Sequence, residues 1–234
     1  MRITLIGTGN VATSLLPALK TAGHLVTQLH GRNFMPEEVE DEVVIVCVCD
    51  DAITSVAAKL ADSSALVVHT AGSIGVEVIP SARRGVLYPM QTFSRLRLVK
   101  MSEVPLFIES PTDLPLLETL ARSVSRIVYP LDSEGRRHLH LAAVFASNFV
   151  NHCYKLSADI LRESDIPFEV MLPLIDEVAR KVHELSPQDA QTGPAARGDL
   201  GVMERQEAML SGRKREIYKL MSQSIYDQLR PIKD

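Results

Sequence analysis

Six residues near the start of the chain constrain its fold more than any other feature. The apolar run at residues 3–6 leads directly into Gly7-Thr8-Gly9-Asn10-Val11-Ala12, which has the spacing G-x-G-x-x-A and opens a helix-forming segment. In such a strand–turn–helix unit the first glycine permits a tight turn, and the second lets a pyrophosphate approach the backbone. The small last residue lets the helix pack closely on the strand, and the free N–H groups at the helix start attract phosphate. The sequence therefore predicts a dinucleotide-binding turn, and the alternative is a glycine-rich turn without a ligand.

Short apolar runs alternate with helix-like segments as far as about Tyr129. Several runs are apolar at consecutive positions, which is typical of strands buried on both faces of a parallel sheet. The alternation predicts an α/β fold, a Rossmann-type doubly wound and mostly parallel sheet. The expected strands are residues 3–6, 25–29, 43–48, 65–69, 85–88, 106–109 and 126–129.

The pattern changes at residues 130–133, beyond which no strand is expected. We expect a dinucleotide-binding Rossmann domain at residues 1–131, followed by a smaller all-α domain at residues 132–234. Its first helix is apolar on every side at residues 141–146, so it must be buried within the domain or against a second subunit. The predicted helices are residues 133–164, 172–185, 200–210 and 213–229, and Pro17 predicts a kink or an early end in the first helix of the α/β part.

Charge and composition exclude several classes of partner. The net charge is −4, which gives no electrostatic basis for binding nucleic acid or an anionic membrane. No apolar run reaches the length of a membrane span, and the start of the chain does not resemble a signal peptide, so we expect a cytoplasmic protein. Cys47 and Cys49 are interpreted as small core residues, since neither has partners at metal-ligand spacing; no metal is expected.

The end of the second predicted strand distinguishes NAD from NADP. NAD sites place Asp or Glu there to bind the ribose 2′-OH, whereas this chain reads His30-Gly31-Arg32-Asn33 and has no acidic side chain in residues 1–36. A carboxylate would repel a 2′-phosphate, and Arg32 is able to pair with it. The sequence favours NADP, with Gly31, Arg32 and Asn33 near its phosphate. The alternative is that Arg32 is a solvated loop charge.

Three further segments follow predicted strands and therefore meet at the same edge of the sheet. They begin at Cys49 after the third strand, at His69 after the fourth and at Gln91 after the fifth. Small and hydroxylated residues there suit a nicotinamide ribose and ring. The expected contacts are Cys49, Thr70, Ala71, Gly72 and Ser73.

The long helix that follows carries polar residues in an apolar setting. Asn148 and His152 are four residues apart, a spacing that puts both on one face of an α-helix. One hypothesis is that Asn148 orients a substrate carbonyl or imine while His152 supplies a proton. The alternative is that neighbouring helices or a dimer partner satisfy both side chains.

Four strings of sequence carry a family resemblance. They are His69-Thr70-Ala71-Gly72-Ser73, residues 87–94, residues 139–149 and residues 191–199. Together they resemble the 6-phosphogluconate dehydrogenase-like superfamily, and in particular its Rossmann-like NADP oxidoreductases, which are related to pyrroline-5-carboxylate reductases and have a helical C-terminal domain of unassigned function. The resemblance implies a Rossmann domain with a cofactor site and a helical second domain that commonly forms a homodimer, but it implies no particular substrate.

One departure from that superfamily affects the expected chemistry. Its β-hydroxyacid dehydrogenases have a catalytic lysine four residues before an asparagine, and here Val144 stands four residues before Asn148. The usual lysine mechanism is therefore not expected, and His152 and His140 become the candidate proton donors.

The resulting hypothesis is an NADP-dependent oxidoreductase that transfers hydride between the nicotinamide and a small carbonyl or imine. The alternative is a non-catalytic NADP(H)-binding sensor or partner-binding protein, which the missing lysine favours.

Overall fold

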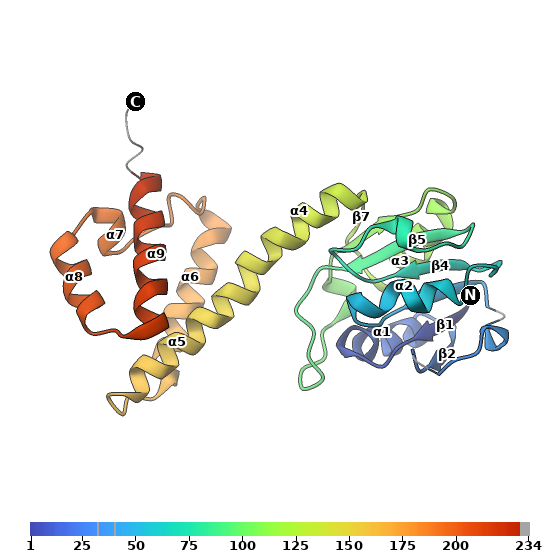
Figure 1. Cartoon of the computed structure of the whole chain (residues 1–234), viewed down its shortest axis with the longest axis horizontal. Helices are drawn as coiled ribbons and strands as arrows, with labels where there is room; N and C mark the ends of the chain where they lie inside the picture. Colours follow the sequence, from blue (N-terminus) through green and yellow to red (C-terminus); the bar gives the residue numbers. More distant parts are fainter. Residues whose placement is uncertain (32, 40, 230–234) are drawn as a thin grey trace. The chain divides into compact units, whose positions relative to one another are not determined.

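The computed structural model describes residues 1–31, 33–39 and 41–229 (Figure 1). The chain forms two compact units, Met1–Val150 and Asn151–Asp234. The last strand ends at Pro130, so the first unit also contains the helical residues that directly follow the sheet. Each unit is described by itself below.

The first unit is built on a seven-stranded sheet in the order β2-β1-β3-β4-β5-β6-β7. Neighbouring strands are parallel except β5 and β6, which are antiparallel. The predicted α/β class with a mostly parallel sheet is thereby confirmed. The strands are β1 (Arg2–Ile6), β2 (Leu25–Leu29), β3 (Val43–Val46), β4 (Leu66–His69), β5 (Arg84–Pro89), β6 (Leu106–Glu109) and β7 (Val128–Pro130).

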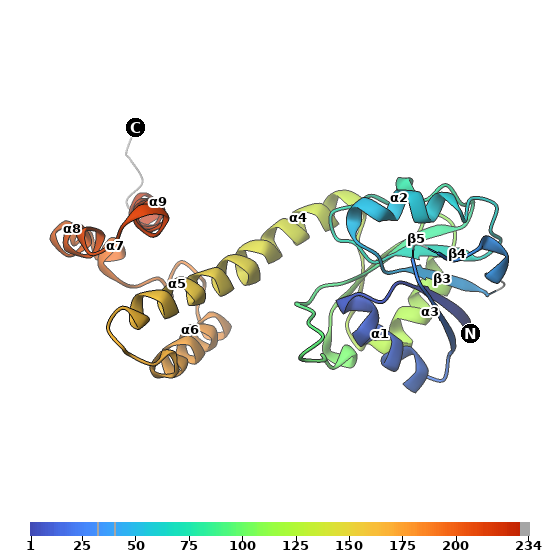
Figure 2. The ribbon, with the colours of Figure 1, turned by 60° about the horizontal axis from the view of Figure 1, so that its bottom comes forward.

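Helices cover both faces of this sheet. Figure 2 shows α1 (Asn10–Thr21) and α3 (Leu114–Val124) on one face and α2 (Asp50–Ala58) on the other. All residues of β3 and β4 are buried, as strands between two helical layers must be. The apolar residues form one cluster on each side of the sheet.

Pro17 does not end the first helix early. Helix α1 continues four residues beyond it to Thr21. Proline in a helix interior costs about 3 kcal/mol, but Leu15 and Leu19 on either side of Pro17 are buried in the core. Of the two expected effects of Pro17, a kink or an early end of the helix, the early end was wrong.

The chain from Asp132 onwards is helical. The side chain of Asp132 accepts a hydrogen bond from the backbone N–H of Gly135 (2.8 Å) and thereby caps the start of α4. Helix α4 (Ser133–Ala143), the π-helical segment η4 (Val144–Phe149) and α5 (Val150–Arg162) follow one another without a break.

The second unit continues with α6 (Leu172–Glu184), α7 (Pro194–Arg197), α8 (Leu200–Ala208) and α9 (Gly212–Leu229). Helices α7 and α8 both pack on α9 (Figure 1). An ion pair between Lys214 and Glu163 (2.6 Å) joins the start of α9 to the turn after α5. No helix among the described residues has the length and apolar character needed to cross a bilayer.

The apolar stretch at residues 141–146 is not buried within this chain. Leu141 is 57% exposed and Phe145 is 63% exposed. Of the two environments expected from the sequence, burial inside the domain is therefore wrong for these side chains. Burial against a second subunit remains a prediction.

Candidate functional site: a cleft over the glycine turn

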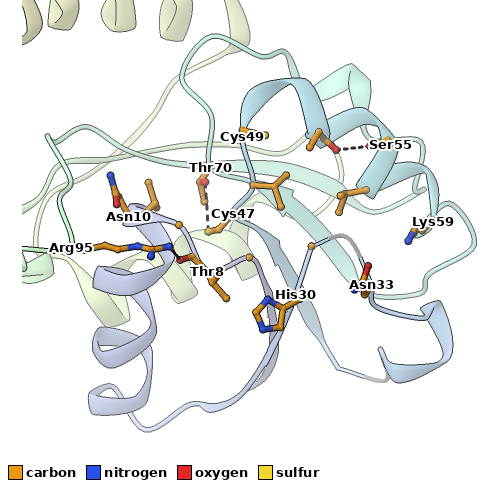
Figure 3. Close-up of a pocket in the computed structure, with 17 residues that line it drawn as sticks. Thr8, Asn10, His30, Asn33, Cys47, Cys49, Ser55, Lys59, Thr70 and Arg95 are labelled. Atoms are coloured by element: carbon orange, nitrogen blue, oxygen red, sulfur yellow. Dashed lines mark hydrogen bonds between the residues drawn. The ribbon is translucent and has the colours of Figure 1, made fainter.

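A cleft of about 920 Å³ lies at the carboxyl ends of the central strands, within the first unit (Figure 3). Ligands of open α/β sheets bind in this position. The strand order reverses there, with β2 on one side of β1 and β3 on the other, which leaves a crevice beyond the strand ends. Nine of the predicted cofactor-binding residues line the cleft: Gly7, Thr8, Gly9, Asn10, Val11, Gly31, Asn33, Cys49 and Thr70. Among the lining residues that sequence reasoning missed are His30, Ser55, Lys59 and Arg95.

The two glycines of the turn have different constraints. Gly7 has φ +127°, and a Cβ there would lie 2.1 Å from the carbonyl oxygen of Cys47, so no side chain fits. A Cβ on Gly9 would meet nothing in the protein closer than 3.9 Å. Gly9 therefore leaves open a space that the protein itself does not fill, as expected where a ligand approaches the backbone.

The start of α1 faces the same cleft with its backbone amides. Gly9 is the N-cap and provides no side-chain cap, and the first turn contains no acidic residue. The first N–H groups of a helix lack partners within the helix, and the helix dipole is positive there. The site therefore favours an anion, and a pyrophosphate fits its chemistry.

A loop from a distant part of the sequence closes over this turn. The Arg95 guanidinium donates a hydrogen bond to the carbonyl oxygen of Thr8 (2.6 Å), and the Asn10 side-chain amide donates one to the carbonyl oxygen of Phe93 (3.1 Å). Figure 3 shows Arg95 beside Asn10 and Thr8. The loop thus adds a permanent positive charge to the region of the free helix amides.

The other end of the cleft is also cationic. In Figure 3, Asn33 and Lys59 lie away from Arg95 and Asn10. The Lys59 ammonium lies 5.0 Å from the centre of the Phe34 ring, a cation–π distance that holds the side chain over this part of the protein. Arg32, which was predicted to bind a 2′-phosphate, lies outside the described residues.

No carboxylate lines the cleft in the part of the chain that the structure describes. This observation matters because an Asp or Glu at the end of β2 is what an NAD site uses to hold the ribose 2′-OH. Gly31 follows β2, and a side chain at this position would clash with the protein, since a Cβ would lie 2.6 Å from the Val48 Cγ1 atom. The donor set suits a phosphorylated ribose.

Four predicted cofactor residues do not line this cleft. Ala12 belongs to α1 and is fully buried, and its small size lets the helix pack closely on the sheet. Ala71, Gly72 and Ser73 follow Thr70 in the chain and are not among the residues that line the cleft. The Ser73 hydroxyl instead donates a hydrogen bond to the Asp50 carboxylate (2.5 Å).

The two neighbouring cysteines occupy different environments. Cys47 is buried, and its burial raises the pKa of the thiol to about 12, so the group stays neutral. Cys49 is exposed at the N-cap of α2, so its prediction as a core residue was wrong. The physical reason is that β3 ends at Val46, and the alternation of a strand does not extend to Cys49. Among the described residues, no group of His, Cys, Asp and Glu is arranged to hold a metal ion.

The predicted catalytic residues follow one another along the helical run. Asn148 lies in η4 and is exposed, and its Oδ1 atom accepts a hydrogen bond from the Ser147 hydroxyl (3.1 Å). His152 is exposed near the start of α5. The expectation that Asn148 and His152 share one face assumed a regular α-helix. Asn148 lies instead in a π-helical segment, whose i→i+5 hydrogen bonds change the number of residues per turn, so four residues no longer make one α-helical turn there. Sequence patterns carry no marker for this segment.

A buried polar network beside the loop that follows β4 was also missed by sequence reasoning. His69 is fully buried, its Nδ1 atom accepts a hydrogen bond from the backbone N–H of Ala71 (3.2 Å), and Nε2 therefore carries the proton that it donates to the carbonyl oxygen of Gly75 (3.2 Å). Burial lowers the pKa of His69 to about 4, which keeps the ring neutral. Next to it, the fully buried Arg136 pairs with Glu109 (2.5 Å).

Comparison with known proteins places the chain in a family. Residues 104–225 match the family model described as "Domain of unknown function (DUF2520)". None of the curated proteins matches the chain. A solved structure from Bacteroides fragilis, described as a "putative NADP oxidoreductase", is 41% identical, with 97% of this chain and 98% of that chain covered and a TM-score of 0.87.

Two more distant structures share the fold. An imine reductase from Streptomyces aurantiacus is 13% identical, with a TM-score of 0.65 and coverage of 98% of this chain and 93% of that chain. A pyrroline-5-carboxylate reductase from Coxiella burnetii is 16% identical, with a TM-score of 0.56 and coverage of 99% and 98%. At these identities the two similarities show a shared fold. The chain belongs to the family described as "Domain of unknown function (DUF2520)".

Proposed function

We propose that the protein is an NADP-dependent oxidoreductase that acts on a small carbonyl or imine compound. The observation that carries the proposal is the cleft itself, which combines an open helix N-terminus, cations at both ends and no carboxylate among its described lining residues. A dinucleotide with a 2′-phosphate matches this charge distribution. NADP would supply or accept a hydride at its nicotinamide ring.

Different residues of the cleft bind different parts of the cofactor. The amides of the glycine turn hold the pyrophosphate, with Arg95 adding charge above it. His30, Asn33 and Lys59 receive the 2′-phosphate end, together with Arg32. Cys49 and Thr70 lie towards the nicotinamide.

The proposed substrate side comes from the helical run after β7. Asn148 orients the carbonyl or imine, and a histidine of the run, His152 or His140, supplies the proton that accompanies hydride transfer. The 41% identical relative described as a "putative NADP oxidoreductase" supports the activity, and the fold shared with an imine reductase supports this class of substrate. A homodimer formed through the helical domain is part of the proposal.

Calorimetry with NADPH and NADH tests the cofactor assignment. We expect NADPH to bind at least about tenfold more tightly than NADH, because a hydrogen bond to a charged group contributes about 1.5–3 kcal/mol. Lys59→Gln should reduce this preference while leaving the affinity for NADH unchanged. Lys20→Gln is the matched control, because Lys20 is exposed on α1 and does not line the cleft. Equal affinity of the wild-type protein for both cofactors, or no binding of either, would overturn the assignment.

A second candidate function is a non-catalytic NADP(H) sensor. Val144 favours it, because the lysine of the β-hydroxyacid dehydrogenases is missing at that position. The sensor binds NADPH but consumes none with any member of a panel of small ketones, aldehydes and cyclic imines. NADPH consumption with one of these compounds excludes it.

A further inference from the structure

A tyrosine and a histidine meet beside the loop that follows β4. The Tyr88 hydroxyl lies 3.1 Å from the Nδ1 atom of His140, and the two rings pack edge to face with their centres 5.9 Å apart. Tyr88 belongs to β5 and is 8% exposed, whereas His140 belongs to α4 and is half-buried. Fifty-two residues separate the two side chains in sequence, so the fold creates the pair.

Gly72 brings the backbone of the β4 loop against this pair. A Cβ on Gly72 would lie 2.6 Å from the His140 Nδ1 atom and 2.8 Å from the Tyr88 Cζ atom. Only glycine fits, and the loop therefore touches both rings. Thr70, two residues earlier, lines the cofactor cleft. The pair thus lies just beyond the Thr70 end of the cleft, the end proposed for the nicotinamide.

Helix α4 is fixed against the same loop by a stripe of three residues. The Ser133 hydroxyl accepts a hydrogen bond from the backbone N–H of Val76 (3.1 Å), and the Arg136 guanidinium donates one to the carbonyl oxygen of Ile74 (2.5 Å). His140, one turn further along, contacts the loop at Gly72. Residues 133, 136 and 140 share one helix face, and they contact the loop at successively earlier positions. His140 is therefore held in place by its helix.

The Tyr88 phenol is protonated at neutral pH and is therefore able to donate a proton. Burial raises the pKa of the Tyr88 phenol, and the nearby positive charge of Arg136 only partly opposes this effect. The phenol accordingly keeps its proton at neutral pH. His140 is partly exposed and connects the buried hydroxyl with solvent.

We infer that Tyr88 and His140 form the proton-donating wall of a substrate site beyond Thr70, which takes a small compound with a C=O or C=N bond. The inference rests on the proposed function. As hydride reaches the substrate carbon, the Tyr88 O–H bond breaks and its proton goes to the substrate oxygen or nitrogen. The phenolate oxygen takes the Nδ1 proton of His140 while a proton from solvent is taken up at Nε2 of the same ring, so the imidazole stays neutral and only its tautomer changes. One hydride and one proton are added in total, and Tyr88 ends as it began. Of the two histidines considered above, this assigns His140.

The location is tested without any substrate, by NMR of the full-length protein with histidine ring labels. NADP⁺ and adenosine 2′,5′-bisphosphate share the adenosine end, but only NADP⁺ carries the nicotinamide. We expect NADP⁺ alone to shift the His140 ring signals, which are assigned by their loss in His140→Gln. His138 is the internal control, because it lies on the same helix, is exposed and bonds only to the carbonyl oxygen of Glu134. Binding of both ligands without an NADP⁺-specific shift at His140 overturns the location, whereas binding of neither overturns the proposed function itself.

The chemical role is tested by NADPH consumption. With the panel compound that the wild-type protein reduces fastest, Tyr88→Phe and His140→Gln should each lower kcat by about 100-fold or more, the range expected for loss of a general acid. The Kd for NADPH should stay within about twofold of the wild-type value, since neither side chain lines the cofactor cleft. His138→Gln should retain wild-type kcat. A loss of less than about tenfold in both variants, or no consumption with any compound while NADP⁺ binds, rejects the proton role.

Discussion

At the scale of single residues, we expect substitution of one glycine of the turn to affect stability and substitution of the other to affect cofactor binding. Gly7→Ala places a Cβ 2.1 Å from the Cys47 carbonyl oxygen at φ +127°, and we expect it to destabilise the protein by about 1–3 kcal/mol or more. Gly9→Ala adds a Cβ that meets nothing within 3.9 Å, so its stability in urea should match the wild-type protein. Its NADPH affinity should nevertheless fall, because the methyl group occupies the space left for the pyrophosphate. Calorimetry and urea unfolding of both variants check this contrast, and unchanged NADPH affinity in Gly9→Ala would contradict it.

His69 gives a pH dependence of stability with a definite sign. Its pKa is lowered by burial from 6.5 to about 4, so between these values the unfolded chain binds a proton that the folded chain does not. Stability contributed by the neutral ring is complete above pH 6.5 and is lost as the pH falls towards 4, by about 2 kcal/mol at pH 5. Urea unfolding at pH 7 and pH 5 measures the loss. His69→Gln cannot titrate and should lose less stability over the same interval; an equal loss would show that other groups cause it.

Single residues of the site were predictable from the sequence where they interact with sequence neighbours, and not where the fold brings distant residues together. The sequence predicted the glycine turn because its six residues are contiguous and each has a local task. Arg95 and Lys59 reach the cleft from a loop and from the end of α2, and no spacing in the sequence links them to Gly7. The Tyr88–His140 contact likewise depends on tertiary packing, although His140 alone was recognisable as a candidate donor.

At the scale of elements, the position of α4 depends on one buried ion pair. Arg136 is fully buried, pairs with Glu109 and bonds to the β4 loop at Ile74. Removing one partner of a buried pair leaves the other charge uncompensated and costs about 3–5 kcal/mol. We expect Arg136→Ala to lower stability by this order, measured by urea unfolding. Arg137→Ala is the matched control, since Arg137 is the next residue and is exposed. Similar losses in both variants would show that the ion pair does not anchor the helix.

The elements themselves were largely predictable. Each of the seven strands appears close to its predicted position, because runs such as β3 and β4 are apolar throughout and must be buried on both faces. The π-helical turn at Val144–Phe149 was not predictable, since its residues fit an α-helix equally well. The compact units also divide after Val150, later than the change of pattern at residue 131, because Arg136 and His140 tie α4 to the sheet domain.

At the scale of the whole molecule, the helical unit has almost no core of its own. Among its described residues only Ala195 and Ser222 are buried. Apolar side chains on α6 face outward instead: Leu174, Val178 and Val182 are more than half exposed and recur every four residues, so they form one face of the helix. Apolar surface on this scale is unfavourable in water and is typical of a protein interface.

From this face we predict that the protein forms a homodimer, which was also expected from the sequence. Val178→Glu combined with Val182→Glu places two charges on the apolar face, and burying them in an interface without partners would cost several kcal/mol. We therefore expect the wild-type protein to sediment as a dimer and this double variant as a monomer with a lower midpoint of thermal unfolding. Arg180→Glu changes an exposed residue of the same helix that pairs with Glu177 (3.5 Å), and this variant should remain dimeric. A wild-type protein that sediments as a monomer would mean that α6 is covered by something other than a second copy.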